Sequence, residues 1–379
     1  MTVAAPANDR RLMEGSEAIA LAAVAAGCRF FAGYPMTPFT EVLEHFARYL
    51  PEVGGTCINA ESELEAVGMA WGALATGERA ATGSTGQGLS LMQESFAEIT
   101  LAELPLVVFD MARGQQDYFQ ATRGGGHGDY RHIVLAPVDI DEAVYLTQLA
   151  FHLADTWRNP VLVLGDYLMA HIQESVSVDP IDFGPVPAKD WALDGSSTGT
   201  GASRLVSPLG LAKEGQPSPG IERHLRTIAA KLRRIESEEV RVDADYVDDA
   251  DTVVVAYGSA AKFVRYVVDV LRAEGERVGY VRPISLWPYP YEAVASAARS
   301  ARTVAVFEVC AGQMIDDVRL GVLGSAPVVQ IGGISTDGSG FGVGRLLDVE
   351  VIRERLLAVH RGGATAELPP LPDNERALY

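Results

Sequence analysis

Helix-type patterns alternate with short apolar runs from about residue 16 to about residue 170, and this alternation constrains the fold more than any other feature. The helix-type segments include EAIALAAVAAG, INAESELEAVGMAWGALATG, LSLMQESFAEITLAE and DIDEAVYLTQLAFHLADTWR, and the strand-type runs are RFFAGYP, RAATGST, LPLVVFDMA, HIVLAP and PVLVLGD. Such a series predicts an α/β fold with a parallel sheet that helices cover on both faces. In sheets of this kind, ligands bind beyond the carboxyl ends of the strands.

The chain changes character over residues 175–220, where Pro, Gly and Ser are frequent, and a charged helix pattern follows in IERHLRTIAAKLRRIESEEVR. A second alternation then runs through DTVVVAYGS, AAKFVRYVVDVLRAEG, RVGYVRPISLWP, YEAVASAARS, RTVAVFEV, QMIDDVRLGVLG and PVVQIGGIS. We therefore expect an α/β domain in residues 1–175, a linker with a charged helix in residues 176–248, and a smaller α/β domain in residues 249–379.

The net charge and the cysteine content argue against several classes of function. The formal net charge of −19 argues against nucleic acid and makes the chain a poor dock for an acidic electron carrier. No uncharged apolar run reaches the length of about eighteen residues that a membrane helix needs, and the start lacks a signal-peptide core, so we expect a soluble cytoplasmic protein. Cys28, Cys57 and Cys310 lack CxxC spacing, which argues against zinc, an iron–sulfur cluster or disulfides in this chain.

One helix-type segment, residues 58–77, carries Glu61, Glu63 and Glu65 ahead of small apolar residues. The residues that share the helix face of Glu63 are Ala66, Val67, Ala70 and Leu74. That face is predicted to be core, whereas Glu61 and Glu65 lie on another face that can stay solvated. A carboxylate on an apolar face can hold a proton near neutral pH and pass it to a ligand. A Glu paired with a buried Arg, or an exposed Glu, remains the alternative.

The loops that follow the strand-type runs hold most of the Gly and polar residues. In GYPMTP, Pro35 and Pro38 fix an extended corner that presents Thr37. GSTGQG opens a helix, so the N–H groups of Thr85 to Gly88 are placed to meet an anion or a ring nitrogen, although a plain tight turn fits the spacing equally.

The loop after LPLVVFDMA concentrates charge, with Arg113, Arg123, His127, Asp129 and Arg131. An arginine fork suits a planar carboxylate, and the glycines 124–126 suggest close approach of backbone to a ligand, to other backbone or at a subunit interface. Asp316 and Asp317 in MIDDVRL, in contrast, are interpreted as helix-surface charges. Neither a Ser/His/Asp order nor a metal-ligand cluster emerges, so we predict no metal on this chain.

Several motifs carry a resemblance when taken together: GSEAIALAAVAAGCRFFAGYPMTPFTEV, AESELEAVGMAWGA, STGQGLSLMQE, DYFQATRGGGHGDYRHIVLAP, LADTWRNPVLVLGD and, later, VVVAYGSAAKFVRYVVDVLRAEGERVGYVRPISLWPYP and EVCAGQMIDDVRL. In order and spacing they resemble the α subunit of 2-oxoacid:ferredoxin oxidoreductases, branched-chain enzymes most of all, over roughly residues 14–350. The resemblance implies that residues 1–175 form a pyrimidine-binding domain for thiamine diphosphate. It implies that residues 249–379 form a domain like the transketolase C-terminal domain.

The resemblance also implies roles for individual residues. Glu63 matches the family glutamate that hydrogen-bonds a pyrimidine nitrogen of thiamine diphosphate, and this proton exchange leads to loss of the thiazolium C2 proton. Thr37 matches the threonine near the oxygen of the substrate, and Arg113 matches the arginine that faces its carboxylate. Pro35, Gln87 and Gly88 are expected beside the cofactor, together with Glu63.

No Gly-Asp-Gly motif with a downstream Asn occurs, so the resemblance implies that a β subunit supplies the diphosphate and Mg²⁺ site. Iron–sulfur and γ-type subunits would pass electrons to ferredoxin, and coenzyme A would accept the acyl group. The longer Gly- and Pro-rich loop that the family carries between Arg113 and Gln116 is missing here. Two alternatives remain: a non-oxidative 2-oxoacid decarboxylase or carboligase subunit, and a non-catalytic assembly subunit.

Overall fold

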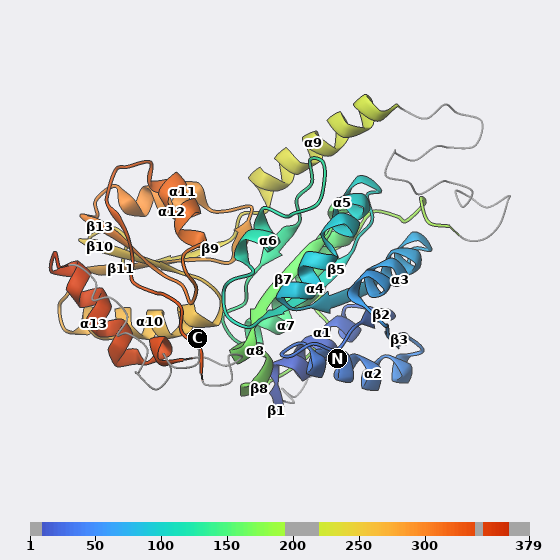
Figure 1. Cartoon of the computed structure of the whole chain (residues 1–379), viewed down its shortest axis with the longest axis horizontal. Coiled ribbons are helices and arrows are strands. Elements are labelled where there is room, and N and C mark those ends of the chain that lie inside the picture. Colours follow the sequence, from blue (N-terminus) through green and yellow to red (C-terminus); the bar gives the residue numbers. More distant parts are fainter. Residues whose placement is uncertain (1–9, 194–219, 338–343, 364–379) are drawn as a thin grey trace, which may run out of the picture.

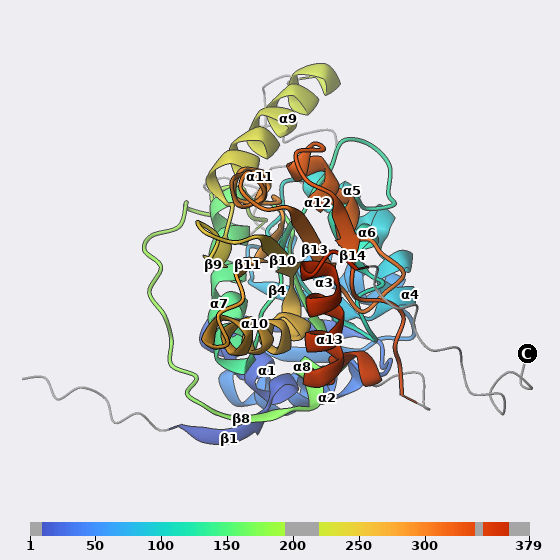
Figure 2. The ribbon, with the colours of Figure 1, turned by 90° about the vertical axis from the view of Figure 1, so that its left-hand side faces the viewer.

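Two sheets lie side by side in the computed structural model, which describes residues 10–193, 220–337 and 344–363 (Figure 1). Much of the Pro-, Gly- and Ser-rich linker, residues 194–219, lies outside the described residues, as does the end of the tail. The charged helix is present as α9 (Ile221–Glu238), and it projects from the body of the molecule in both views (Figure 2).

The first sheet has seven strands in the order β12-β6-β7-β5-β4-β2-β3. Their bounds are β2 Phe30–Gly33, β3 Thr56–Asn59, β4 Ala80–Ser84, β5 Val107–Ala112, β6 Ile133–Leu135, β7 Val161–Asp166 and β12 Ser285–Trp287. All neighbouring pairs are parallel except β12 and β6. A separate antiparallel pair joins β1 (Arg11–Glu14) to β8 (Gln173–Val176).

Helices cover both faces of this sheet, as the alternation predicts. On one face lie α1 (Gly15–Ala25), α2 (Thr40–Tyr49), α7 (Ile140–Trp157) and α8 (Tyr167–His171), whose buried side chains form one core. On the other lie α3 (Glu63–Ala75), α4 (Gly86–Leu91), α5 (Gln93–Leu101) and α6 (Tyr118–Thr122). A short 3-10 helix, η1 (Pro51–Val53), follows α2.

The second sheet has five strands in the order β14-β13-β10-β11-β9, parallel except for β9 against β11. Their bounds are β9 Val242–Asp245, β10 Thr252–Ala256, β11 Val278–Pro283, β13 Thr303–Phe307 and β14 Val328–Gln330. Helices α10 (Gly258–Ala273) and α13 (Val349–His360) pack against one face of this sheet. Helices α11 (Tyr291–Ala298) and α12 (Met314–Val322) pack against the other face. A short 3-10 helix, η2 (Arg345–Leu347), precedes α13.

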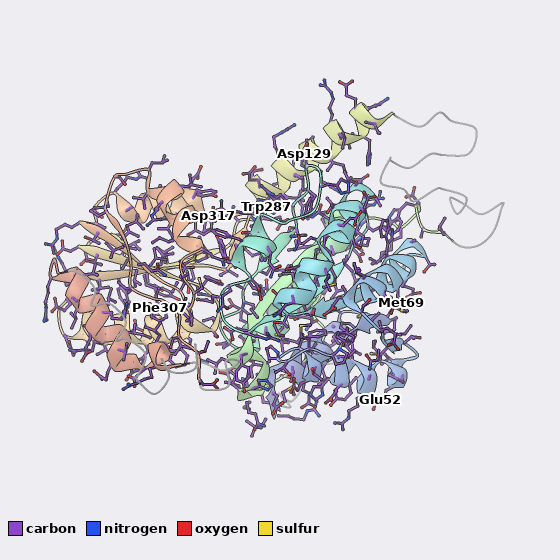
Figure 3. All side chains as sticks on the ribbon, viewed as in Figure 1. Glu52, Met69, Asp129, Trp287, Phe307 and Asp317 are labelled. Atoms are coloured by element: carbon purple, nitrogen blue, oxygen red, sulfur yellow. The ribbon has the colours of Figure 1, made fainter. Side chains whose placement is uncertain are left out.

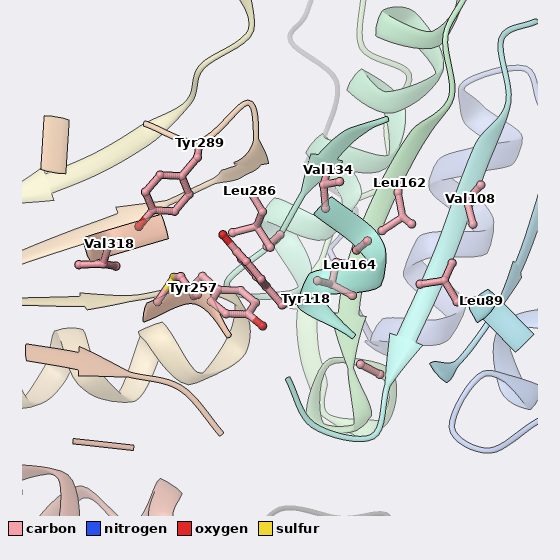
Figure 4. Close-up of a cluster of buried hydrophobic side chains, with 14 of the residues drawn as sticks. Leu89, Val108, Tyr118, Val134, Leu162, Leu164, Tyr257, Leu286, Tyr289 and Val318 are labelled. Carbon is pink, nitrogen blue, oxygen red and sulfur yellow. The ribbon is translucent and has the colours of Figure 1, made fainter. Parts of the chain in front are cut away.

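One continuous core joins the two sheets, because the cluster that contains Val108 and Leu162 of the first sheet also contains Val253 of the second. In Figure 4, Tyr118 of α6 lies between the first-sheet side chains and Tyr257, whose ring centroid is 5.6 Å away. The second half of the chain also contributes β12 to the first sheet.

The structure differs from the sequence-based expectation at several elements, among them β3, which takes the first residues of the segment 58–77 that was predicted as a helix. The segment LSLMQESFAEITLAE is not one helix, since α4 ends at Leu91 and α5 begins at Gln93. RVGYVRPISLWP is not one strand, because β11 ends in the second sheet and β12 joins the first. The helix α13 was not expected. Among the residues described, no helix is long and apolar enough to cross a membrane.

Candidate active site

The first candidate residue, Glu63, is the first residue of α3 and is only 2% exposed. Ser62 caps this helix, because its hydroxyl accepts a hydrogen bond from the main-chain N–H of Glu65 at 3.3 Å. The buried residues of α3 after Glu63 are Ala66, Val67, Ala70 and Leu74. They form the stripe that the helical period predicts, while Glu61 and Glu65 are exposed. The alternative of an exposed Glu63 is therefore wrong.

Two residues around the end of β4 shape the surroundings of Glu63. The hydroxyl of Ser84, the last residue of β4, donates a hydrogen bond to Glu63 Oε1 at 3.0 Å, and Ser84 is itself buried. Gly88 in α4 lies against the same groups, because a Cβ atom there would stand 2.0 Å from Ser84 Oγ and 2.3 Å from Glu63 Oε1. Only glycine fits this close contact with the two side chains.

Thr37 and Arg113 meet at the same edge of the sheet. Thr37 follows β2 and Arg113 follows β5, and the carboxyl ends of these parallel strands lie at one edge with that of β4 between them. The Nε of Arg113 donates a hydrogen bond to the main-chain oxygen of Thr37 at 3.2 Å. The side chains of Thr37 and Pro35 are exposed, and the peptide bond between Thr37 and Pro38 is cis.

Some N–H groups at the N-terminus of α4 already have hydrogen-bond partners within the chain. The N–H of Gly86 donates to Asp117 Oδ2 at 3.2 Å, and the N–H of Gly88 donates to the carbonyl of Thr85 at 2.8 Å. The alternative of a plain tight turn therefore describes the N–H group of Gly88, and the N–H group of Gly86 is paired with a side chain of the same chain. Gln87 has an exposed side chain next to them.

The other charged residues of the loop after β5 do not converge with Arg113. Arg123 pairs with Asp317 at 3.1 Å, His127 pairs with Glu98 at 2.9 Å, and Arg131 donates to the carbonyl of Arg123 at 3.1 Å. Figure 3 shows Asp129 well separated from Met69 on α3.

The glycines of that loop surround Tyr130. The N–H groups of Gly125 and Gly126 donate to its hydroxyl at 2.9 and 2.7 Å. A Cβ atom at Gly126 would stand 2.5 Å from the carbonyl oxygen of Gln93, so backbone does approach backbone closely here.

The expectation that Asp316 and Asp317 are both helix-surface charges is wrong for Asp317, which is only 7% exposed. Asp316 is exposed, as predicted. The carboxylate of Asp317 accepts hydrogen bonds from the hydroxyl of Tyr118 at 2.7 Å and the hydroxyl of Tyr291 at 2.6 Å, besides Arg123. The error arose because a helical pattern cannot show that α6 of the first sheet and α11 pack against this face of α12.

Two buried acids near the site were not foreseen. Asp110, the register neighbour of Ser84, is 0% exposed, and neither carboxyl oxygen has a hydrogen-bond partner among the described residues. Burial and the nearby Asp117 raise the pKa of Asp110 well above its usual value. Burial also raises the pKa of Asp117. The position of Asp110 within a predicted strand was the one signal in the sequence.

A small cleft with a volume of about 10 Å³ lies beside Arg113 between the two sheets. Its lining comes from both: Arg113, Gly114, Gln115, Asp166, Tyr167, Ser259, Ala260, Val309, Ser335 and Leu347. Asp166 accepts a hydrogen bond from the hydroxyl of Ser259, and burial raises its pKa. Residues of both sheets therefore surround Arg113.

Comparison with known proteins identifies the family. Residues 21–191 match a family described as pyruvate flavodoxin/ferredoxin oxidoreductase, thiamine diP-bdg, and residues 250–340 match pyruvate:ferredoxin oxidoreductase core domain II. The ketoisovalerate oxidoreductase subunit VorB of Methanothermobacter marburgensis is 37% identical over 320 residues, which cover 82% of this chain and 89% of that protein. The chain belongs to the 2-oxoacid:ferredoxin oxidoreductase family.

Solved structures agree with this family. The 2-oxoglutarate:ferredoxin oxidoreductase from Magnetococcus marinus, with 2-oxoglutarate, coenzyme A and succinyl-CoA bound, superposes with a TM-score of 0.78 at 25% identity, over 95% of this chain and 68% of that one. A split-gene transketolase, 16% identical over 90% of this chain and 97% of its own, shares the fold with a TM-score of 0.54. The predicted family, the α/β fold and the role of an oxidoreductase subunit are confirmed.

Proposed function

We propose that the chain is the α subunit of a heteromeric, thiamine-diphosphate-dependent 2-oxoacid:ferredoxin oxidoreductase. The complex would remove CO₂ from a 2-oxoacid, transfer the acyl group to coenzyme A, and pass a pair of electrons through iron–sulfur clusters of partner subunits to ferredoxin. Because that reaction consumes coenzyme A and uses a soluble electron carrier, we place it in the cytoplasm. Residues 1–175 would be the pyrimidine-binding domain, 176–248 the linker and charged helix, and 249–379 the transketolase-C-terminal-like domain.

The observation that carries this proposal is the surroundings of Glu63. Its carboxyl group is buried within the segment that matches the thiamine-diphosphate-binding family, at the carboxyl edge of a parallel sheet. Gly88 packs directly against that carboxyl group, so α4 approaches Glu63 as closely as a residue without a side chain allows. When bound, thiamine diphosphate supplies the carbanion stabilisation that decarboxylation of a 2-oxoacid needs.

The residues of this chain would prepare that chemistry by holding protons and orienting the substrate. Glu63 would exchange a proton between its carboxyl group and a pyrimidine nitrogen, while Ser84 holds Oε1 in place. Gln87, Gly88 and Pro35 would line the cofactor. Thr37 would lie near the 2-oxo oxygen, and the guanidinium of Arg113 would face the carboxylate, since its fork matches both carboxylate oxygens.

The proposed partner subunits follow from the motifs that this sequence lacks. It has no Gly-Asp-Gly diphosphate motif, so a β subunit would hold the diphosphate and Mg²⁺. Its three cysteines are too few for an iron–sulfur cluster with four thiolate ligands, so iron–sulfur and γ-type subunits would carry the clusters. The net charge of −19 also suits a subunit that does not itself dock an acidic ferredoxin.

The test is reconstitution of the complex with its β and cluster-bearing subunits. We expect 2-oxoacid-dependent reduction of ferredoxin that requires thiamine diphosphate, Mg²⁺ and coenzyme A, assayed over branched-chain 2-oxoacids, pyruvate and 2-oxoglutarate. Release of an aldehyde with no electron transfer would point instead to non-oxidative decarboxylation. Absence of any thiamine-dependent turnover in a complete complex would contradict the proposal.

A further inference from the structure

The segment that follows Arg113 crosses from the first sheet to the second. Gln115, which is 4% exposed, uses its side chain for this crossing: Nε2 donates to the carbonyl of Tyr257 at 3.0 Å, and Oε1 accepts from the N–H of Val309 at 2.7 Å. Its main-chain N–H also donates to the carbonyl of Val309 at 3.3 Å. Tyr257 and Val309 lie just beyond β10 and β13, so Gln115 bonds to the ends of two strands of the second sheet.

A second glutamine makes the reciprocal crossing. Gln313, just before α12, donates from Nε2 to the carbonyl of Gln116 at 2.7 Å and accepts at Oε1 from the N–H of Phe119 at 2.7 Å. The buried carboxylate of Glu308 fixes this position, because it accepts from the N–H groups of Gln313 at 3.0 Å and Met314 at 2.9 Å. We call the contacts of Gln115 and Gln313 the inter-sheet clamp.

The clamp leaves little freedom for Arg113. Only Gly114 separates Arg113 from Gln115, so a displacement of Gln115 passes to the arginine through two peptide units. The guanidinium of Arg113, at the far end of its side chain, donates a hydrogen bond to the main-chain oxygen of Thr37. Buried amide hydrogen bonds cost free energy when they are broken without replacement, which makes the clamped position well defined.

We propose that Gln115 is a positioning residue for substrate recognition, which fixes the Arg113 guanidinium against Thr37 by anchoring its segment to the second sheet. This inference rests on the proposed role of Arg113. The second half of the chain thereby sets the geometry with which the carboxylate of a 2-oxoacid is bound.

The test uses Gln115→Ala in the assembled complex. A misplacement of about 1 Å can cost a hundredfold, so we expect KM for the 2-oxoacid to rise by about ten- to a hundredfold. Exchange of the thiazolium C2 proton with deuterated water, which does not need Arg113, should change by less than about twofold.

Two controls separate positioning from general support. Gln116→Ala keeps the main-chain carbonyl that Gln313 contacts and removes only an exposed side chain, so KM should stay unchanged. Tyr118→Phe removes another inter-sheet hydrogen bond, to Asp317, farther along the chain from Arg113, so it should affect stability more than KM.

A double-mutant cycle gives the decisive outcome. In the background of Arg113→Ala, Gln115→Ala should add little to the loss in kcat/KM, because both changes remove the same positioned guanidinium. Additive losses, a parallel loss of C2 exchange, or a KM equal to that of Gln116→Ala would overturn the inference. If Gln115→Ala fails to assemble, Gln313→Ala breaks the clamp from the other sheet and should raise KM in the same way. A wild-type complex without thiamine-dependent turnover would instead refute the proposed function.

Discussion

The hydroxyl of Ser84 donates a hydrogen bond to Oε1 of Glu63 across 3.0 Å, at the point where β4 ends and α3 begins. The bond joins two buried side chains, so it sets the orientation of the carboxyl group within the apolar face of α3. A carboxyl group held in this way is suited to repeated proton exchange with one ligand atom, which the proposed function requires.

Gly88→Ala should disrupt that arrangement. The new Cβ would stand 2.0 Å from Ser84 Oγ, and overpacking of this kind costs about 1–3 kcal/mol of the free energy of unfolding. The matched control is Gly68→Ala on α3, where a Cβ meets nothing within 4 Å and the gain in helix propensity is about 0.5–1 kcal/mol. Urea unfolding of the full chain compares the two variants, and equal stabilities would contradict the close contact at Gly88.

Asp110→Asn should change how stability depends on pH. Burial raises the pKa of Asp110 in the folded protein, so the folded carboxyl stays protonated while the unfolded one ionises as pH rises above about 4. The free energy of unfolding of the wild type therefore falls by up to about 1.4 kcal/mol for each pH unit between these two pKa values. The variant has no carboxyl group at this position and does not show this fall.

The measurement for Asp110 is urea unfolding between pH 5 and 7.5. The difference between variant and wild type should move in favour of Asp110→Asn as pH rises, and Asp129→Asn, at an exposed site, should show little change. A difference that is flat with pH for Asp110→Asn would mean that the buried carboxyl is already ionised in the folded state.

Arg113→Ala in the full complex should weaken substrate binding while the cofactor remains bound. Hydrogen bonds to charged groups contribute about 1.5–3 kcal/mol, which corresponds to a rise in KM of roughly ten- to a hundredfold. Arg319→Ala, an exposed arginine on α12, serves as the control. Steady-state kinetics over a panel of 2-oxoacids checks this, and unchanged KM values would reject the role of Arg113.

The isolated chain should bind thiamine diphosphate weakly or not at all. In the proposed function it contributes only the pyrimidine end of the site, and it lacks the diphosphate and Mg²⁺ motif, so most of the binding free energy would have to come from the β subunit. Titration calorimetry of the separated chain, followed by the same titration with the β subunit added, tests this expectation. Tight binding by the chain alone would argue against a site shared between subunits.

The sequence predicted the face of Glu63 because a helical period of 3.6 residues alone decides which side chains share a stripe. Ala66, Val67, Ala70 and Leu74 are all buried with it. It also placed Thr37 and Arg113 at one edge, because the carboxyl ends of parallel strands lie together. The catalytic and cofactor-binding roles of these residues remain predictions.

What the sequence missed depends on contacts between distant segments. Asp317 looks like a surface charge within its own helix, and becomes buried only because α6 of the first sheet packs against α12. Gln115 carries no local signal, since its partners Tyr257 and Val309 are far away in the chain. The separation of β12 from β11 likewise follows from pairing with β6 and not from the apolar pattern.

The most direct test of the account is the rate at which the thiazolium C2 proton exchanges with deuterated water in the assembled complex, measured for Glu63→Gln. Glutamine keeps the size and a hydrogen-bonding group but cannot exchange a proton as a carboxyl group does. We predict assembly and cofactor binding with exchange and turnover slowed by about a hundred- to ten-thousandfold, and much smaller effects for Glu61→Gln and Glu65→Gln at exposed positions. An unchanged exchange rate in Glu63→Gln, or abolished exchange in Glu65→Gln, would contradict the assignment of Glu63.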